Sequence, residues 1–189
     1  MSKFLGQHFL KNRATIKKMV TALDLKENET VIEIGPGHGE LTTELLRYPI
    51  NLIAVEKDKV LVKKLAEKFL ISNFEFRIIE GDILKILPKL EIQNSKFKII
   101  GNIPYYITGH LFRIIGELAN KPQVTVFTVQ KEVGERLTAQ PPKMNRLAAS
   151  VQVWAEAKII ANIPAQAFDP PPKVNSVIIK LKPGPDSTT

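Results

Sequence analysis

The chain has 189 residues, of which 44% are hydrophobic and 24% are charged, with a net charge of +8. These values are typical of one soluble globular domain, and no apolar run approaches the ~20 residues that a membrane span needs. The absence of cysteine excludes disulfides and thiolate metal sites, and the three histidines lie far apart, so we expect no metal site. Residues 1–10 hold no apolar stretch of signal-peptide length. We therefore expect a cytoplasmic protein that does not associate with a membrane.

Helical periodicity alternates with short apolar runs along most of the chain. In chain order, the pattern predicts a helix over residues 15–23, a strand over 31–34, a helix over 40–47, a strand over 51–55, a helix over 59–69, strands over 74–79 and 97–100, a helix over 110–118, a strand over 124–129, a helix over 131–137, and strands over 151–160 and 174–181. Asn12 is positioned to cap the first helix.

This alternation predicts an α/β fold, because strands joined by helices pair in parallel through right-handed crossovers. The last two predicted strands have no clear helix between them, which predicts an antiparallel hairpin at the end of the sheet. Residues 183–189 have the composition of a frayed end or a linker.

The positive charge is concentrated at the two ends of the chain. Residues 1–23 carry +5, residues 24–139 are neutral, and residues 140–189 carry +3. If the two ends meet in space, they form one basic surface that suits a polyanion such as RNA. The alternative is ordinary solubilising charge.

A glycine-rich turn follows the first predicted strand and precedes a helix. Its sequence is G-x-G-x-G over residues 35–39, which differs from the G-x-G-x-x-G of dinucleotide binders. Gly35 and Gly37 allow a ligand to approach the backbone closely, at the edge of the sheet where ligands bind in open parallel sheets. A turn with no ligand is the alternative interpretation.

Polar residues end the next three predicted strands. Glu56 lies about 20 residues after the glycine turn, where an acid accepts hydrogen bonds from a ribose diol. Asp82 is suited to accept from an adenine amino group, and Asn102 ends the following strand. Each residue alone is more typical of a surface group or a cap, but together they predict a site for an adenosine-bearing cofactor.

The most specific short motif is Asn102-Ile103-Pro104-Tyr105. The N6 lone pair of adenine is delocalised into the ring, so a methyl-transferring enzyme must orient the amine and accept its hydrogens. The side-chain oxygen of Asn102 and the carbonyl of Ile103 are suitable acceptors, Pro104 stiffens the loop, and Tyr105 offers a ring for stacking on an unpaired adenine. A proline turn with an aromatic plug is the alternative.

With these motifs, the chain resembles the ribosomal RNA adenine N6-dimethyltransferases over nearly all of residues 3–182. The matching motifs are LGQHFL at 5–10, EIGPGHG at 33–39, Glu56, Gly81-Asp82, NIPYYIT at 102–108 and FDPPPKVNS at 168–176. The resemblance implies a Rossmann-like class I methyltransferase domain over residues 1–182, with a seven-stranded, mostly parallel sheet. It also implies S-adenosylmethionine as the cofactor, with rRNA and the small ribosomal subunit or its precursor as partners of a monomer.

The resemblance further implies roles for residues that the local patterns do not single out. His8 and Leu10 are expected to touch the cofactor alongside Gly35, Glu56, Asp82 and Asn102, and Phe168 to stack on the target adenine opposite Tyr105. Two departures stand out. His8 occupies a position where many members carry Asn, and the small helical C-terminal domain usual in the family is expected to be absent from this chain.

The expected reaction is dimethylation of adenine N6 in small-subunit rRNA during ribosome biogenesis. The alternatives are the related large-subunit rRNA methyltransferase that confers antibiotic resistance, a non-catalytic rRNA-binding assembly factor, and a small-molecule methyltransferase. Residues 106–108 and 170–173 favour the small-subunit group, the intact motif at 102–105 favours catalysis, and the basic chain ends argue against a small substrate.

Overall fold

The structure is a computed structural model that describes residues 8–69, 75–92 and 96–184. Residues 5–7 of the first motif, residue 74 of a predicted strand, and residues 185–189 of the predicted tail lie outside the described residues. Among the helices of the described ranges, none is long and apolar enough to cross a membrane.

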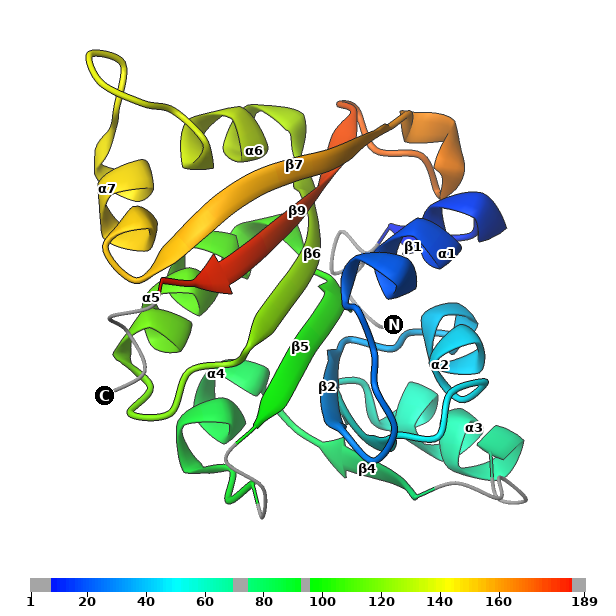
Figure 1. The fold of residues 1–189 in the computed structure, drawn as a ribbon. Coiled ribbons are helices and arrows are strands. Elements are labelled where there is room, and N and C mark those ends of the chain that lie inside the picture. The colour runs from blue at the N-terminus through cyan, green and yellow to red at the C-terminus, as the bar shows by residue number, and fades with distance from the viewer. Residues whose placement is uncertain (1–7, 70–74, 93–95, 185–189) are drawn as a thin grey trace.

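The main sheet contains seven strands within the described residues. They are β2 (Thr30–Ile34), β3 (Asn51–Glu56), β4 (Phe76–Glu80), β5 (Phe97–Asn102), β6 (Val124–Gln130), β7 (Ala155–Ile163) and β9 (Ser176–Pro183). Their order is β4-β3-β2-β5-β6-β9-β7, with parallel pairs from β4 to β6 and with β9 antiparallel to both β6 and β7 (Figure 1). The predicted mostly parallel sheet with a terminal antiparallel hairpin is confirmed.

Helices cover both faces of this sheet (Figure 1). They are α1 (Arg13–Ala22), α2 (Glu40–Leu45), α3 (Lys59–Phe69), α4 (Ile83–Ile86), α5 (Thr108–Glu117), α6 (Lys131–Leu137) and α7 (Arg146–Gln152). Asn12 caps α1 as predicted, because its side-chain oxygen accepts a hydrogen bond from the Thr15 N–H at 2.9 Å. The short α4 directly follows Asp82, which caps it by accepting a hydrogen bond from the Leu84 N–H.

Two hydrophobic clusters form the core, one on each face of the sheet. Val31 of β2 packs with residues of α1 and α2, whereas Ile32 packs with residues of α5 and α7. This follows from the alternation of side chains along a strand. Because both faces are covered, the central strands are buried along their length and only their ends reach a cavity or solvent.

The predicted strand over residues 151–160 was wrong in its first part. Residues up to Gln152 belong to α7, which Asn145 caps through the N–H groups of Leu147 and Ala148. The strand begins only at Ala155, where burial starts to alternate. Apolar residues continue across the boundary between the helix and the strand, so the change from helical to strand periodicity is not visible in the sequence. The cap at Asn145 was the signal that could have revealed the helix.

A second, two-stranded sheet joins distant parts of the chain. It consists of β1 (Phe9–Leu10) and β8 (Phe168–Asp169), which pair in antiparallel fashion. Beside it, Lys11 forms an ion pair with Asp169, and a ring nitrogen of His8 lies 2.7 Å from the carbonyl oxygen of Pro170. The N-terminal segment is therefore held against residues more than 150 positions away.

Candidate active site

A cavity of about 330 Å³ lies at the carboxyl ends of β2, β3, β4 and β5. Because β2 pairs with β3 on one side and β5 on the other, the order of the strands reverses here, and ligands bind at such a switch point. Most of the predicted site residues line this cavity, namely His8, Gly35, Gly37, Glu56, Asp82, Asn102, Ile103, Pro104 and Tyr105.

The glycine turn forms part of the wall. Gly35 and Gly37 have φ values of +63° and +61°, which side-chain-bearing residues rarely adopt. A Cβ on Gly35 would find no atom within 4 Å, so the backbone there borders open space. A Cβ on Gly37 would lie 2.9 Å from the Phe9 ring, which packs directly on the turn.

Glu56 is buried at the end of β3, with 4% of its surface exposed. Its carboxylate accepts hydrogen bonds from the backbone N–H groups of Gly37 at 3.2 Å, Lys57 at 2.8 Å and Asp58 at 2.9 Å. Three donors therefore hold the carboxylate at the cavity wall and connect it to the glycine turn.

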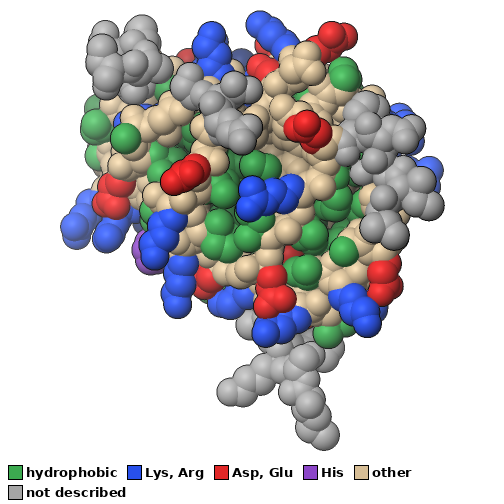
Figure 2. All heavy atoms as spheres, turned by 90° about the horizontal axis from the view of Figure 1, so that it is seen from below, with side chains coloured by type: hydrophobic (Ala, Val, Ile, Leu, Met, Phe, Trp, Pro, Cys, Tyr) green, Lys and Arg blue, Asp and Glu red, His purple; other side chains and the backbone are tan. Residues whose placement is uncertain are grey.

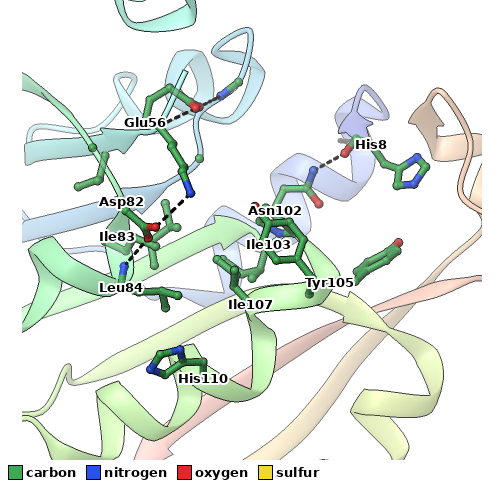
Figure 3. Close-up of a pocket in the computed structure, with 18 of the residues that line it drawn as sticks. His8, Glu56, Asp82, Ile83, Leu84, Asn102, Ile103, Tyr105, Ile107 and His110 are labelled. Carbon is green, nitrogen blue, oxygen red and sulfur yellow. Dashed lines mark hydrogen bonds and ion pairs between the residues drawn. The ribbon is translucent and has the colours of Figure 1, made fainter. Parts of the chain in front are cut away.

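Asp82 lies on the same side of the cavity as Glu56 (Figure 3). Its carboxylate accepts hydrogen bonds from the Lys57 ammonium at 3.1 Å and from the Leu84 N–H at 3.0 Å. Burial alone would raise the pKa of Asp82, but these hydrogen bonds and the positive charges of Lys57 and Lys85 together outweigh burial and lower the pKa below its ordinary value.

Asn102 and Tyr105 lie on the opposite side with His8 (Figure 3). The Asn102 side-chain nitrogen donates to the His8 carbonyl at 2.6 Å, and its oxygen accepts from the Thr128 hydroxyl. The Tyr105 ring is stacked near the His8 ring, with centroids 6.0 Å apart. Burial raises the pKa of the Tyr105 hydroxyl, and its 2.8 Å hydrogen bond with Ser176 opposes part of that rise.

Leu10 and Phe168 are not among the residues that line the cavity. They face each other in the register of β1 and β8 and are buried in the core cluster beneath α1, Phe168 with 4% exposure. The structure thus places the Phe168 ring in the core and does not bring it into the cavity beside Tyr105.

The structure adds residues that the sequence analysis missed. Lys57 and the largely exposed Tyr106 line the cavity, and Thr128 and Ser176 contact its residues from neighbouring strands. Lys57 and Tyr106 directly follow predicted site residues in the sequence, and this adjacency could have identified them. Thr128 and Ser176 lie within strands far along the chain, and only the strand register reveals their position.

The charge distribution matches the sequence expectation in part. At the β1–β8 pair, described residues of the two basic segments 1–23 and 140–189 do meet, next to the exposed Arg13, Lys17 and Lys18 of α1. Other basic residues gather elsewhere, around a hollow of about 320 Å³ whose lining includes Lys26, Lys96, Lys98, Lys180 and Lys182 together with Asp24 and Glu29. The basic residues of the described chain are therefore not gathered on one surface.

One face of the molecule is a poor match for a polyanion. Figure 2 shows this face from below, with Lys and Arg side chains mixed with Asp and Glu side chains and hydrophobic side chains gathered nearer its centre. Such a mixture creates no extended field of one sign.

Within the described ranges, no group of three or more His, Asp or Glu side chains could hold a metal ion.

The sequence has relatives over almost its whole length. The family described as "Ribosomal RNA adenine dimethylase" matches residues 1–188. "Ribosomal RNA small subunit methyltransferase A" of Dehalococcoides mccartyi is 44% identical over 180 residues, which are 95% of this chain and 62% of that protein. The protein of the same name from a Sulfurihydrogenibium species is 37% identical over 96% of this chain and 71% of that protein. The chain thus spans about three fifths to two thirds of the length of most such relatives.

Two solved structures are similar as well. A dimethyladenosine transferase from Plasmodium falciparum superposes with a TM-score of 0.85 at 30% identity, covering 95% of this chain and 65% of that one. The 23S rRNA methyltransferase ErmE superposes with a TM-score of 0.83 at 27% identity, covering 94% and 70%. On the match of the family over residues 1–188 and the identity to these relatives, the chain belongs to the ribosomal RNA adenine dimethylase family.

Proposed function

We propose that this chain transfers methyl groups from S-adenosylmethionine to the N6 of adenine in small-subunit rRNA, giving N6,N6-dimethyladenosine. The observation that carries the proposal is one cavity that combines a glycine turn, two carboxylates at strand ends and the Asn102–Tyr105 loop. The names of the relatives that share 37–44% identity support the small subunit as the target. We further propose that the chain acts as a monomer in the cytoplasm, on the small subunit or its precursor.

The groups that line the cavity fit S-adenosylmethionine. The open space beside Gly35 admits a ligand against the backbone, Glu56 offers a carboxylate for a ribose diol, and Asp82 offers one for an adenine amino group. We propose that His8 adds to this wall from the N-terminal segment. When bound, the cofactor supplies an electrophilic methyl group on a sulfonium.

The work of the chain is to hold the target amine in position. We propose that the Asn102 side-chain oxygen and the Ile103 carbonyl accept the N6 hydrogens, while Pro104 limits the motion of the loop. As the amine gains positive charge during transfer, it binds these acceptors more tightly, so the acceptors act mainly in the transition state. A second acceptor also allows the monomethylated amine to bind in either orientation.

For adenine stacking we propose Tyr105, whose ring lines the cavity. Phe168 would have to leave its packed position in the core to reach the base. We therefore propose that Phe168 and its partner Leu10 support the wall from behind rather than contact the ligands.

A second candidate is methylation of large-subunit rRNA, which the likeness to the 23S rRNA methyltransferase ErmE favours. Incubating the purified chain with labelled S-adenosylmethionine and under-methylated subunits of both kinds, followed by nucleoside mass spectrometry, separates the two. We expect dimethyladenosine in the small subunit alone. Label found only in the large subunit would support the second candidate, and label in neither would refute both.

Asn102→Ala provides the catalytic control in this assay. Losing one oriented acceptor should lower kcat by roughly 10²–10³ and leave the KM for RNA less affected, with monomethyl product accumulating. Asn162→Ala on β7, where the side chain is exposed and the strands β6 and β9 separate it from β5, should behave as wild type. Wild-type turnover and product ratio in the Asn102 variant would disprove the role of Asn102.

A further inference from the structure

The side chain of Asn102 is held from two sides, by a carbonyl that can only accept and by a hydroxyl that can also donate. The His8 carbonyl can only accept, so the side-chain nitrogen of Asn102 must face it, at 2.6 Å. The side-chain oxygen consequently faces β6, where the Thr128 hydroxyl donates to it. Thr128 is opposite Asn102 in the parallel register and is fully buried. The orientation of the amide thus follows from its partners.

The hydrogen bond from Thr128 leaves Asn102 able to accept another. An amide oxygen has two lone pairs, and the Thr128 hydroxyl uses one of them. The torsion that turns an Asn amide has a broad, shallow profile, so the direction of the free lone pair depends on hydrogen-bonding partners. His8 fixes the nitrogen end only, through a segment that enters from the N-terminus.

We propose that Thr128 is a positioning residue for the transfer step: its hydroxyl aims the free lone pair of the Asn102 oxygen at the target amine. The proposal deepens the function proposed above and rests on it. According to this proposal, β6 contributes to catalysis in addition to the Asn102–Tyr105 loop. It also explains a polar residue at a fully buried position between the apolar Phe127 and Val129.

The same strand supplies a matched control. Thr125 is also buried on β6, with 1% exposure, and within the described residues its hydroxyl has no hydrogen-bond partner. Thr125→Val and Thr128→Val remove the same hydroxyl from the same strand with the same change of shape. Only the second removes a hydrogen bond to Asn102.

The kinetic test compares Thr128→Val, Thr128→Ser and Thr125→Val with wild type. We expect Thr128→Val to lower kcat by roughly tenfold to a hundredfold, the cost of misplacing a reacting group. The KM for RNA and the calorimetric affinity for S-adenosylmethionine should stay within about twofold, because binding contacts are kept. Thr128→Ser should restore most of the rate, and Thr125→Val should not lower it. A wild-type rate in Thr128→Val, failure of Ser to rescue, or equal loss in Thr125→Val would overturn the proposal.

A second measurement does not depend on activity. In protein labelled with ¹⁵N on Asn side chains, the Asn102 resonances are identified by their loss in Asn102→Ala. We expect their hydrogen exchange to become faster in Thr128→Val and to stay unchanged in Thr128→Ser and Thr125→Val. Unchanged exchange in Thr128→Val would overturn the positioning role. If wild type transfers no methyl group to RNA, the proposed function fails, and this measurement still decides whether Thr128 orients Asn102.

Discussion

Glu56 combines a structural role with a position in the wall of the cavity. Its carboxylate accepts three backbone hydrogen bonds, and the residue also lines the cavity, so the group that holds the glycine turn in place borders the space that we propose for the cofactor. In Glu56→Gln, an amide N–H₂ would face backbone donors, and the negative charge would be lost. The substitution should therefore affect binding in two ways.

We expect Glu56→Gln to weaken S-adenosylmethionine binding by about 1–3 kcal/mol, the usual cost of losing a charged hydrogen-bond partner. Isothermal titration calorimetry measures this change. The control is Glu80→Gln, since Glu80 is opposite Glu56 in the β3–β4 register but pairs with Lys59 at the surface. Equal affinities of wild type and Glu56→Gln would remove Glu56 from the binding site.

Tyr105 and Phe168 should respond differently to truncation because one lines the cavity and the other is in the core. Tyr105→Ala should impair capture of the adenine, raising the KM for RNA by an amount equivalent to about 1–3 kcal/mol. Phe168→Ala should lower the free energy of unfolding by about 3–5 kcal/mol. Steady-state kinetics and urea denaturation of both variants test the difference. A stable Phe168→Ala variant with a selective loss of RNA capture would show that Phe168 does stack on the base.

At the scale of the element, α1 presents basic side chains that are free to meet phosphate. Arg13, Lys17 and Lys18 are exposed, whereas Lys11 forms an ion pair with Asp169, whose hydrogen bond raises the pKa of Lys11. An ammonium that already has a carboxylate partner contributes less to binding another anion. Contacts to RNA should therefore depend on the three residues of α1 more than on Lys11.

Replacing Arg13, Lys17 and Lys18 with Gln should reduce the slope of log affinity against log salt by about 0.7 for each lost phosphate contact to single-stranded RNA. Filter binding or fluorescence anisotropy over a range of salt concentrations measures the slope. Replacing Lys63 and Lys64, which are exposed on α3, removes two positive charges from another helix, against three from α1. If both sets of replacements give the wild-type slope, the residues of α1 only solubilise the protein.

The elements that sequence patterns predicted are those whose signals are local. The strand ends at Gly35, Glu56, Asp82 and Asn102 could be placed because a short apolar run followed by a polar residue marks the end of a buried strand. The parallel pairing of these strands then placed their ends on one edge of the sheet. The cavity lining confirms that these four residues lie around one space.

The features that escaped prediction depend on pairing between distant segments. β1 and β8 are two residues long, too short for any periodicity, and exist because each supplies the partner of the other. Likewise, Thr128 contacts Asn102 only through the register of β5 and β6. The burial of Phe168 also follows from this pairing, which a single Phe in a proline-rich segment does not reveal.

At the scale of the whole molecule, one buried acid couples stability to pH. Glu33 of β2 is fully buried, and its carboxylate accepts a hydrogen bond from the Thr42 hydroxyl at 2.7 Å. Within the described residues its other oxygen has no partner. Burial raises the pKa of Glu33 from 4.5 to about 8, although the Thr42 hydrogen bond opposes the rise.

The folded state therefore binds a proton that the unfolded state releases between pH 4.5 and about 8. As the pH rises across this window, the contribution of protonated Glu33 to the free energy of unfolding should fall by up to about 1.4 kcal/mol per pH unit. Below and above the window, this contribution should not change with pH. Urea denaturation of wild type and Glu33→Gln from pH 5 to 9 measures the loss. The Gln variant should show a flatter profile and a relative gain at high pH. Parallel profiles would show that Glu33 does not titrate in this range.

The position of β9 between β6 and β7 affects how the molecule is assembled during translation. β7 leaves the ribosome before β9, yet β9 separates it from the rest of the sheet. Until β9 has been synthesised, β7 lacks the strand that it pairs with in the finished sheet, so β7 can take its final place only once β9 is available. Ser176, the hydrogen-bonding partner of Tyr105, arrives with β9. Both the hydrogen-bonding partner of Tyr105 and β8, the partner of the N-terminal strand β1, are therefore synthesised near the end of the chain, so the two supports of the cavity wall that they provide are added last.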